Sequence, residues 1–259
     1  MFPYLEEPAL RAFGQVVTAF QVLVFVAVAV GYQVLSRRAA RRGWDPELTL
    51  SLVLWTLFAG FAGSHLFDTL LYEREALRKN PLVLLELWGT MSSYGGLLGG
   101  VAGAFWAMRR RKLPAAQMFA FIDLVAFSFA FAWIFGRLGC ALAHDHIGVE
   151  TGSVLAVRFP SGPRYDLGLL EFLYTLFIAA LFLWLDRKPR PTGFFVAVFF
   201  ALYGPVRFAL DALRVGDTRY LGWTPGQYVS VAAAAFGLAL LRLLTRPAPA
   251  SAARPAPPA

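Results

Sequence analysis

Seven long apolar runs, separated by short stretches that carry charged residues, dominate the chain. A bilayer core of about 30 Å needs about 20 apolar residues to be crossed by a helix, and each run is of that order. The expected helices cover residues 14–35, 48–72, 91–108, 115–143, 168–185, 192–213 and 225–244. The pattern therefore predicts an all-α integral membrane protein, with a seven-helix membrane domain over residues 1–245.

The composition agrees with a membrane protein. Of the 259 residues, 58% are hydrophobic and 15% are charged, against about 45–50% and about 25% in an average soluble domain. Cys140 is the only cysteine, which excludes an internal disulfide and a metal site built from cysteines. Residues 246–259 are rich in Pro and Ala and lack an apolar period. We expect them to form a disordered cytoplasmic tail.

The net charge of +8 would suit a nucleic-acid-binding protein, but the basic residues lie between the apolar runs. Short cytoplasmic loops carry an excess of Lys and Arg. The loops after the first, third and fifth runs and the chain end hold 14 basic residues, whereas the opposite loops hold eight. This asymmetry predicts an outside N-terminus and a cytoplasmic C-terminus, and it argues against nucleic acid as a partner.

Ionisable residues inside apolar runs are costly and usually mark a polar cavity. The candidates are Arg137, His144, Asp145 and His146 at the end of the fourth run; Tyr203, Arg207, Asp211 and Arg214 on one face of the sixth; and His65 and Asp68 in the second. The predicted topology brings all of them to the outer leaflet. Two arginines at headgroup depth suit a phosphate, because each guanidinium is a planar, charged donor fork. Alternatively, Arg207 and Asp211 only neutralise each other, and Arg137 only extends to the interface.

The three histidines allow several interpretations. His144 and His146 flank Asp145, and together with His65 they could bind a transition metal. They could also lie in a solvated loop, or transfer protons, because a free histidine has a pKa of about 6.5. We expect acid/base chemistry and no metal. Cys140 is expected to be a small packing residue.

A glycine-rich segment follows Tyr94 at the start of the third run. Gly95, Gly96 and Gly99 would allow another helix to pack closely. The same glycines would also let a substrate approach the backbone N–H groups. The sequence alone favours neither interpretation.

These residues resemble the motifs of the prolipoprotein diacylglyceryl transferase family. Residues 136–139, with Asp145 and Gly148, are similar to the family signature GRxGN-x-x-N-x-E-x-x-G, and residues 94–99 are similar to HGGLIG. Residues 203–207, with Asp211 and Arg214, are similar to YGxxRFxxExxR. Further matches are Gly222, Gly226, Gln227 and Ser230 in a closing G-x-x-x-G-Q-x-x-S, and Asp123, Arg164 and Glu171 elsewhere.

The chain departs from these motifs at several positions. Tyr94 replaces the histidine of the glycine element, Cys140 and Ala143 replace two signature asparagines, Phe20 replaces a tyrosine of the first run, and His65 replaces an arginine of the second. Residues 164–171 agree only at their ends with the family element H-P-S-Q-x-Y-E. This pattern is typical of a divergent branch or paralogue.

The resemblance implies a multi-pass enzyme of the bacterial inner membrane. Its reaction would move diacylglyceryl from phosphatidylglycerol to the lipobox cysteine of a preprolipoprotein, forming a thioether without any cofactor. Arg137 and Arg207 would stabilise the departing phosphate, and His144 or His146, oriented by Asp145, would accept the thiol proton, with Tyr94 as the competing base. The expected substrate-binding residues are Tyr94, Gly95, Gly96, Gly99, Tyr203, Asp211, Arg214 and His65.

Two other functions remain open. A non-catalytic paralogue would keep the phospholipid pocket without the proton chemistry. A solute or metal transporter is less favoured, because transport sites usually lie near the midplane between internal repeats, and this sequence shows no repeat. Nothing in the sequence indicates the oligomeric state.

Overall fold

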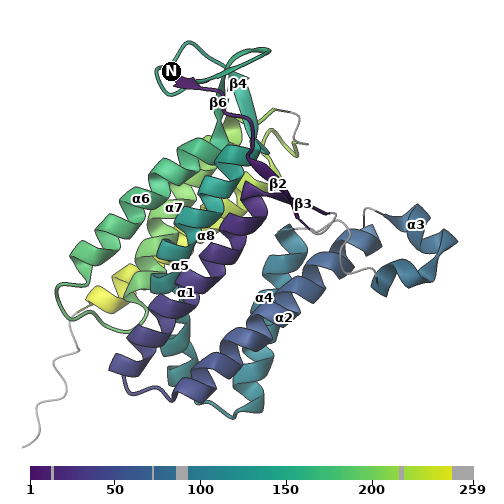
Figure 1. Ribbon diagram of the computed structural model, residues 1–259. Coiled ribbons are helices and arrows are strands. Elements are labelled where there is room, and N and C mark those ends of the chain that lie inside the picture. Colours follow the sequence, from purple (N-terminus) through teal and green to yellow (C-terminus); the bar gives the residue numbers. More distant parts are fainter. Residues whose placement is uncertain (13–14, 72, 86–92, 216–218, 247–259) are drawn as a thin grey trace, which may run out of the picture. The chain divides into compact units, whose positions relative to one another are not determined.

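The computed structural model describes residues 1–12, 15–71, 73–85, 93–215 and 219–246. Its long helices are α1 (Ala19–Arg41), α2 (Pro46–Leu71), α4 (Ser93–Arg110), α5 (Ala115–Ala143), α6 (Leu167–Leu185), α7 (Phe194–Ala212) and α8 (Pro225–Thr245) (Figure 1). A short helix α3 (Arg74–Lys79) and a 3₁₀ helix η1 (Pro81–Leu85) lie between α2 and α4. Each predicted apolar run thus contains one long helix. The predicted tail after Arg246 lies outside the described residues.

Six of these helices are long and apolar enough to cross a membrane within the part of the chain that the structure describes. They are α1, α2, α5, α6, α7 and α8. Helix α4, which we expected to be the third span, is not among them; its 18 residues include five glycines and end on Arg109 and Arg110. The protein is therefore a mostly helical membrane protein with six candidate spans.

The expectation of an all-α chain is wrong in detail, because two small sheets lie outside the long helices. One has the strand order β1-β5-β6-β4, formed by β1 (Phe2–Pro3), β5 (Val157–Phe159), β6 (Gly162–Asp166) and β4 (Ile147–Glu150). β1 runs parallel to β5, and the other neighbours are antiparallel. These strands have two to five residues, too few for a clear period-two pattern in the sequence.

The second sheet changes the start of the first long helix. β2 (Ala9–Ala12) and β3 (Gln15–Thr18) form an antiparallel hairpin, so α1 begins at Ala19 rather than at the predicted residue 14. The Thr18 N–H donates to Gln21 Oε1 (3.0 Å), and the Gln21 N–H donates to Thr18 Oγ1 (3.5 Å). This reciprocal capping box satisfies backbone donors that have no partner inside the helix, and it fixes where α1 begins.

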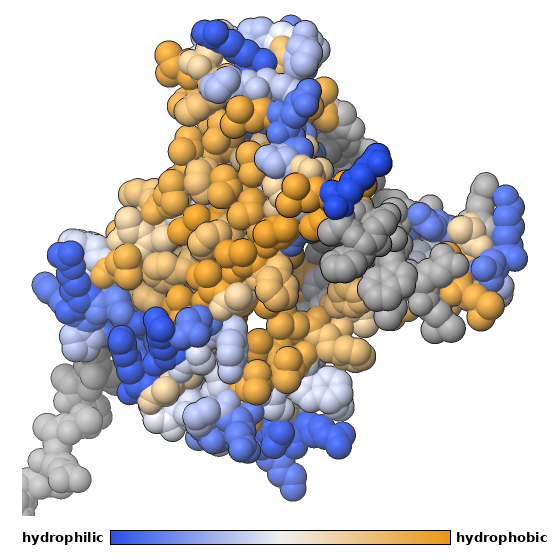
Figure 2. Space-filling view, in the orientation of Figure 1, coloured by the Kyte–Doolittle hydropathy of each residue, from blue (hydrophilic) through white to orange (hydrophobic). Residues whose placement is uncertain are grey.

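The chain divides into two compact units, residues 1–30 with 125–259 and residues 31–124, which we describe separately. In the first unit, Phe127, Phe182 and Phe195 from α5, α6 and α7 form an aromatic core, with ring centroids 4.8–6.0 Å apart. Helices α7 and α8 approach closely at Gly204, where an added Cβ would lie 2.6 Å from Ser230 O. In the view of Figure 2, hydrophobic residues cover the helices of this unit and hydrophilic residues gather at its sheet.

In the second unit, α2 and α4 pack through glycines, with little side-chain material between them. A Cβ added to Gly63 would lie 2.7 Å from Gly95 O. Gly99 is just as tightly placed, against Ala59 of α2. The structure therefore shows close helix packing at Gly95 and Gly99, whereas the substrate-binding role of the glycine segment stays a prediction.

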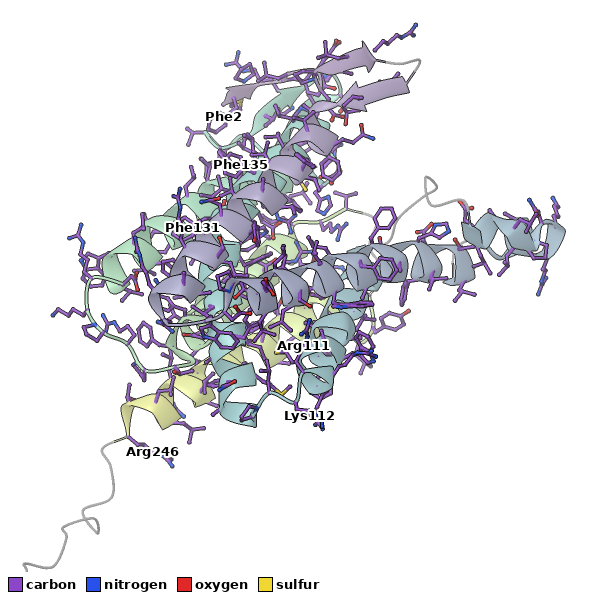
Figure 3. All side chains as sticks on the ribbon, turned by 60° about the horizontal axis from the view of Figure 1, so that its bottom comes forward. Phe2, Arg111, Lys112, Phe131, Phe135 and Arg246 are labelled. Carbon is purple, nitrogen blue, oxygen red and sulfur yellow. The ribbon has the colours of Figure 1, made fainter. Side chains whose placement is uncertain are left out.

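The α4–α5 end of the second unit carries an apolar core and a basic turn. Leu35, Leu52, Met108 and Phe121 are buried together where α1, α2, α4 and α5 meet. Arg111 and Lys112 lie in the turn between α4 and α5 (Figure 3), and Lys112 has a positive φ of 53°. Figure 3 also labels two aromatic residues of the first unit, Phe131 and Phe135, which lie one helical turn apart on α5.

Candidate active site

The centre of the candidate site is Glu171 in the second turn of α6, which is fully buried. Its Oε2 lies 2.8 Å from Arg137 Nη1 of α5. Its Oε1 accepts hydrogen bonds from Arg207 Nη1 and from the hydroxyl of Tyr203, both on α7 and both at 3.1 Å. One carboxylate thus joins polar side chains from three membrane helices.

The buried carboxylate of Glu171 explains why Arg137 and Arg207 lie close together. A carboxylate buried within a membrane helix is very costly unless charged partners surround it, so Glu171 requires the two guanidinium groups. The Arg207–Asp211 pair exists, with 3.0 Å between Nη2 and Oδ1, but it is part of a larger cluster. Arg137 pairs with Glu171 and does not merely extend to the interface. Both arginine side chains remain 18% exposed, so the pairing with Glu171 does not bury either of them completely.

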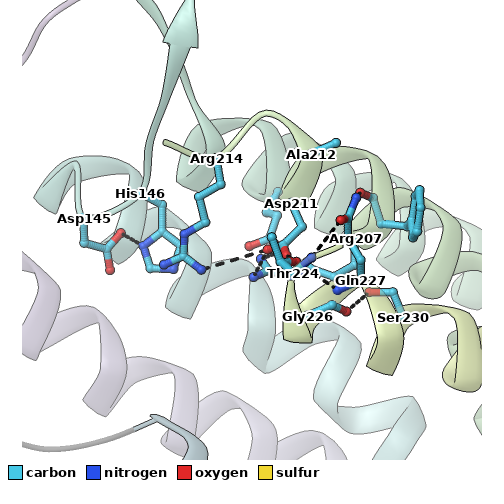
Figure 4. A network of polar contacts seen from close by, with 12 residues as sticks. Asp145, His146, Arg207, Asp211, Ala212, Arg214, Thr224, Gly226, Gln227 and Ser230 are labelled. Atoms are coloured by element: carbon cyan, nitrogen blue, oxygen red, sulfur yellow. Dashed lines mark hydrogen bonds and ion pairs between the residues drawn. The ribbon is translucent and has the colours of Figure 1, made fainter. Parts of the chain in front are cut away.

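The cluster continues from Asp211 into the start of α8 (Figure 4). Asp211 is buried, accepts a hydrogen bond from the Thr224 hydroxyl, and lies 4.0 Å from Arg214. Thr224 is the N-cap of α8 and forms a capping box with Gln227. Gly226 has no space for a side chain, because an added Cβ would lie 2.7 Å from Asp211 Oδ2. The first turn of α8 is therefore fixed against the acidic end of the cluster.

His144 lies at the end of α5 with both ring nitrogens engaged. Nε2 lies 2.9 Å from the carbonyl oxygen of Leu5, which can only accept a hydrogen bond, so Nε2 carries a proton. Nδ1 lies 2.5 Å from Asp166 Oδ2, and the ring stacks on Tyr4 with centroids 4.7 Å apart. His144 thus has no free nitrogen to offer a substrate.

Asp166 has a structural role of its own in this pair. Its Oδ1 accepts a hydrogen bond from the Leu169 N–H and so caps the N-terminus of α6. Burial raises the pKa of Asp166 above its ordinary value, although the hydrogen bond from His144 acts in the opposite direction. The pair joins the end of α5, the start of α6 and the N-terminal segment.

His146 lies two residues further along in a more open position. Its Nδ1 is 2.9 Å from Asp145 Oδ1, and the two side chains are 23% and 37% exposed. Burial acts to raise the pKa of Asp145, but the hydrogen bond and charge of His146 outweigh it, so that the pKa lies below its ordinary value. A tautomer of His146 that directs an Nδ1–H at Asp145 would carry its lone pair on Nε2. His146 is therefore better suited than His144 to accept a proton.

Cys140 connects the two parts of the site. Arg137 Nη1 donates to its sulfur at 3.7 Å, and Asp145 is close enough to interact with the thiol electrostatically. Gly168 of α6 lies against the Cys140 backbone, where an added Cβ would be 2.9 Å away, whereas the packing role that we expected for the Cys140 side chain stays a prediction. The structure also places Cys140 in a polar chain from Arg137 to Asp145 and His146.

The remaining predicted residues belong to the second unit or lie outside the described side chains. The Tyr94 side chain is not described, so its role stays a prediction. Gly95, Gly96 and Gly99 lie along α4, where Gly95 and Gly99 contact α2. His65 is buried in α2, and its Nε2 lies 3.2 Å from Val83 O of η1. Among the described residues, no group of three His, Cys, Asp or Glu side chains is placed to hold a metal ion.

Sequence reasoning missed three members of the site. Glu171 was noted as a family-like position and not as a site residue, although a carboxylate within an apolar run carries the same warning as an arginine there. The hydroxyl of Thr224 and the amide of Gln227 were missed as well. Their spacing, Thr-x-x-Gln before an apolar run, is the capping-box pattern and could have been recognised.

Comparison with known proteins identifies the family to which the chain is similar. The family model described as prolipoprotein diacylglyceryl transferase matches residues 8–243. A phosphatidylglycerol–prolipoprotein diacylglyceryl transferase of Pseudomonas fluorescens is 30% identical over 98% of this chain and 99% of its own length. Proteins of the same name from Pseudomonas paraeruginosa and Pseudoalteromonas atlantica are 29% and 30% identical, each over 93% of this chain and over 94% and 89% of their own lengths.

These relatives come from bacteria and align over nearly the whole chain, which itself has six apolar helices of spanning length. The protein is thus a multi-pass protein of the bacterial inner membrane. The matched range also includes the Glu171 cluster and the Asp145–His146 pair. The chain therefore belongs to the prolipoprotein diacylglyceryl transferase family.

Proposed function

We propose that this chain transfers the diacylglyceryl group of phosphatidylglycerol to the lipobox cysteine of a prolipoprotein. The observation that carries the proposal is the pair of arginines held on one buried carboxylate. Arg137 and Arg207 meet at Glu171, and each of the two side chains is still 18% exposed. A phosphodiester headgroup is the ligand that two such donor forks bind best.

The arginines would act on the group that leaves. The acceptor sulfur attacks the glyceryl carbon, a C–S bond forms, and the bond from that carbon to the phosphate oxygen breaks. Glycerol phosphate departs with the electron pair. Donors already placed by Glu171 stabilise this growing negative charge without having to reorganise during the reaction. Glu171 would be a positioning residue, because both guanidinium groups take their direction from it.

The proton of the acceptor thiol must go to a base, because a free thiol has a pKa of about 8.5 and is mostly protonated at neutral pH. We assign this role to Nε2 of His146, with Asp145 holding Nδ1. The alternative base His144 is less favoured, since both of its nitrogens are engaged. Tyr94 stays an open alternative, although a phenol with a pKa of about 10 is a weak base at neutral pH.

We also propose the finer membrane arrangement that the loop charges indicate. In it, residues 1–245 form one membrane domain, α4 is the third of seven spans, the N-terminus is outside and the tail is cytoplasmic. The sheet that follows α5 would then lie on the outer side with the site. Reporter fusions after Lys112 and after Arg219 should read cytoplasmic and external, respectively. The reverse result would move the site to the inner leaflet and contradict the mechanism.

One assay separates the enzyme from a non-catalytic phospholipid-binding paralogue. The purified protein is incubated with phosphatidylglycerol and a lipobox peptide, and the peptide is analysed by mass spectrometry. The expected product carries one diacylglyceryl group on its cysteine, and a peptide with Ser in place of that cysteine should remain unmodified. Binding of phosphatidylglycerol without any adduct would favour the non-catalytic paralogue.

A further inference from the structure

A tight turn precedes α8 and presents an exposed apolar side chain. Tyr220 and Trp223 pair through two backbone hydrogen bonds, from Tyr220 N to Trp223 O (2.7 Å) and from Trp223 N to Tyr220 O (3.1 Å). Leu221 and Gly222 form the two-residue tip, with φ values of 50° and 88°. Leu221 is 99% exposed, the highest value among the exposed large hydrophobic residues of the described chain.

The backbone at the tip disfavours the residue that it carries. A two-residue hairpin with positive φ at both central positions usually has Asn or Asp followed by Gly, because other side chains are strained there. Gly222 fits this rule and Leu221 does not. A strained and fully exposed leucine does nothing for the packing of the turn, so its presence points to something outside the chain.

The turn is attached to the side of α8 that faces lipid. The Tyr228 hydroxyl donates to Tyr220 O at 2.8 Å, and the rings of Tyr228 and Trp223 have centroids 5.3 Å apart. From there, Val229, Phe236 and Leu243 form an exposed apolar stripe along α8, with one member every seven residues. Since α8 is a candidate span, this stripe is a surface for acyl chains.

The position of the turn along α8 also fits a membrane surface. The turn lies immediately before the first residue of the span, at the level where the apolar part of the helix begins. Trp and Tyr are enriched at this depth, because their rings are apolar and their polar atoms reach the headgroups. Tyr220, Trp223 and Tyr228 are all partly exposed here.

We propose that the 220–223 turn is a membrane anchor, in which Leu221 inserts into the leaflet at the N-terminal end of α8. The turn is joined directly to the site, because the next residue, Thr224, hydrogen-bonds Asp211. An anchor at this point holds Asp211, and with it Arg207, at a constant depth relative to the lipid headgroups. The partner is the lipid leaflet itself, and the proposal does not depend on the transferase activity.

Spin labels test this placement in the intact protein. Nitroxides are attached to Leu221→Cys and, as the control, to Ser161→Cys, an exposed position in the turn between β5 and β6. Cys140 is retained, and its labelling is measured on the unsubstituted protein. In phosphatidylglycerol-containing bilayers, the label at 221 should collide more with oxygen than with a water-soluble nickel complex, and the label at 161 should do the opposite. Equal nickel accessibility at the two positions would overturn the anchor.

A second variant separates an anchor from a packing role. Leu221→Asn removes the apolar side chain but suits a positive φ, so the thermal midpoint in detergent should stay equal or rise. The same substitution should lower the oxygen-to-nickel collision ratio of a label at Tyr220→Cys in bilayers, as the tip leaves the leaflet. A fall in the midpoint together with an unchanged ratio would show that Leu221 packs within the protein and would contradict the anchor.

Discussion

Two histidine–aspartate pairs lie within a few residues of each other and have opposite surroundings. The His144–Asp166 pair is closed: Asp166 is fully buried, both nitrogens of His144 are engaged, and the ring contacts Tyr4 and Phe159. The His146–Asp145 pair is open and continues into the arginine cluster. The same two residue types thus form a closed, buried joint in one place and an open, partly exposed pair in the other, and we assign proton transfer to the open pair.

Replacing the histidine of the open pair should have the greatest effect on activity. His146→Ala should reduce diacylglyceryl transfer by about 100- to 10,000-fold, the usual range for loss of a general base. The thermal midpoint should change little, because the side chain is partly exposed. The measurement is turnover with phosphatidylglycerol and a lipobox peptide, with His144→Asn as the matched control. Retained activity in His146→Ala would move the base elsewhere, with Tyr94 the next candidate.

Breaking the closed pair should destabilise the protein. His144→Asn keeps a residue that suits the positive φ of 51° but removes the partner of a buried carboxylate. Loss of one member of a buried ionic pair costs about 3–5 kcal/mol, and the asparagine amide should recover part of this. Unfolding of the purified protein should therefore occur at a clearly lower temperature, while the folded fraction keeps turnover within a few-fold. An unchanged midpoint would mean that this pair is not a joint.

The arginine cluster lies next to the open pair, through Cys140 and Asp145. Arg137→Lys and Arg207→Lys keep the charge but lose the two-pronged donor. Losing one charge-assisted hydrogen bond costs about 1.5–3 kcal/mol, or roughly a tenfold to hundredfold drop in rate if the contact acts in the transition state. Turnover is compared at matched expression and thermal stability. Near-normal rates in both variants would remove the phosphate role and leave only the pairing with Glu171.

The smallest expected effect is a difference in pH dependence. The pKa of Asp145 lies below its ordinary value, so its stabilising contribution is present at neutral pH and is lost as the pH falls through that lowered pKa. The pKa of Asp166 is raised, so its contribution is present in acid and is lost as the pH rises through the raised value. Asp145→Asn and Asp166→Asn should therefore change the slope of the thermal midpoint between about pH 3 and 6 in opposite directions. Changes in the same direction would contradict this assignment.

Much of the helical framework could be predicted, because a membrane span can be recognised in the sequence by its length and its apolar content. The run at 115–143 and the helix α5 have the same bounds, and α8 differs from its predicted run by one residue. The sheets could not be predicted in the same way. The strand Val157–Phe159 is held by its pairing with residues far away in the sequence, and three residues carry too little pattern to show it.

Most residues of the candidate site could be predicted, although Glu171 at its centre was not singled out, and the contacts were less predictable. The spacing of Tyr203, Arg207 and Asp211 placed them on one helical face, and the structure joins the three. The difference between His144 and His146 could not be seen in the sequence. It depends on Leu5, whose carbonyl oxygen is 139 residues away along the chain and engages only one of the two rings.

The glycine seam between α2 and α4 has a consequence for how such chains change over generations. Backbone lies against backbone at Gly63, Gly95 and Gly99, so every replacement adds volume where no rotamer change can make room. Substitution is therefore strongly disfavoured at these positions, whereas exposed side chains of the same two helices, such as Phe58 and Leu97, are free of this limit. The Gly-Gly-x-x-Gly spacing of α4 is therefore required by the short distance between the two helix axes. A descendant protein could lose the catalytic residues and still retain this glycine spacing.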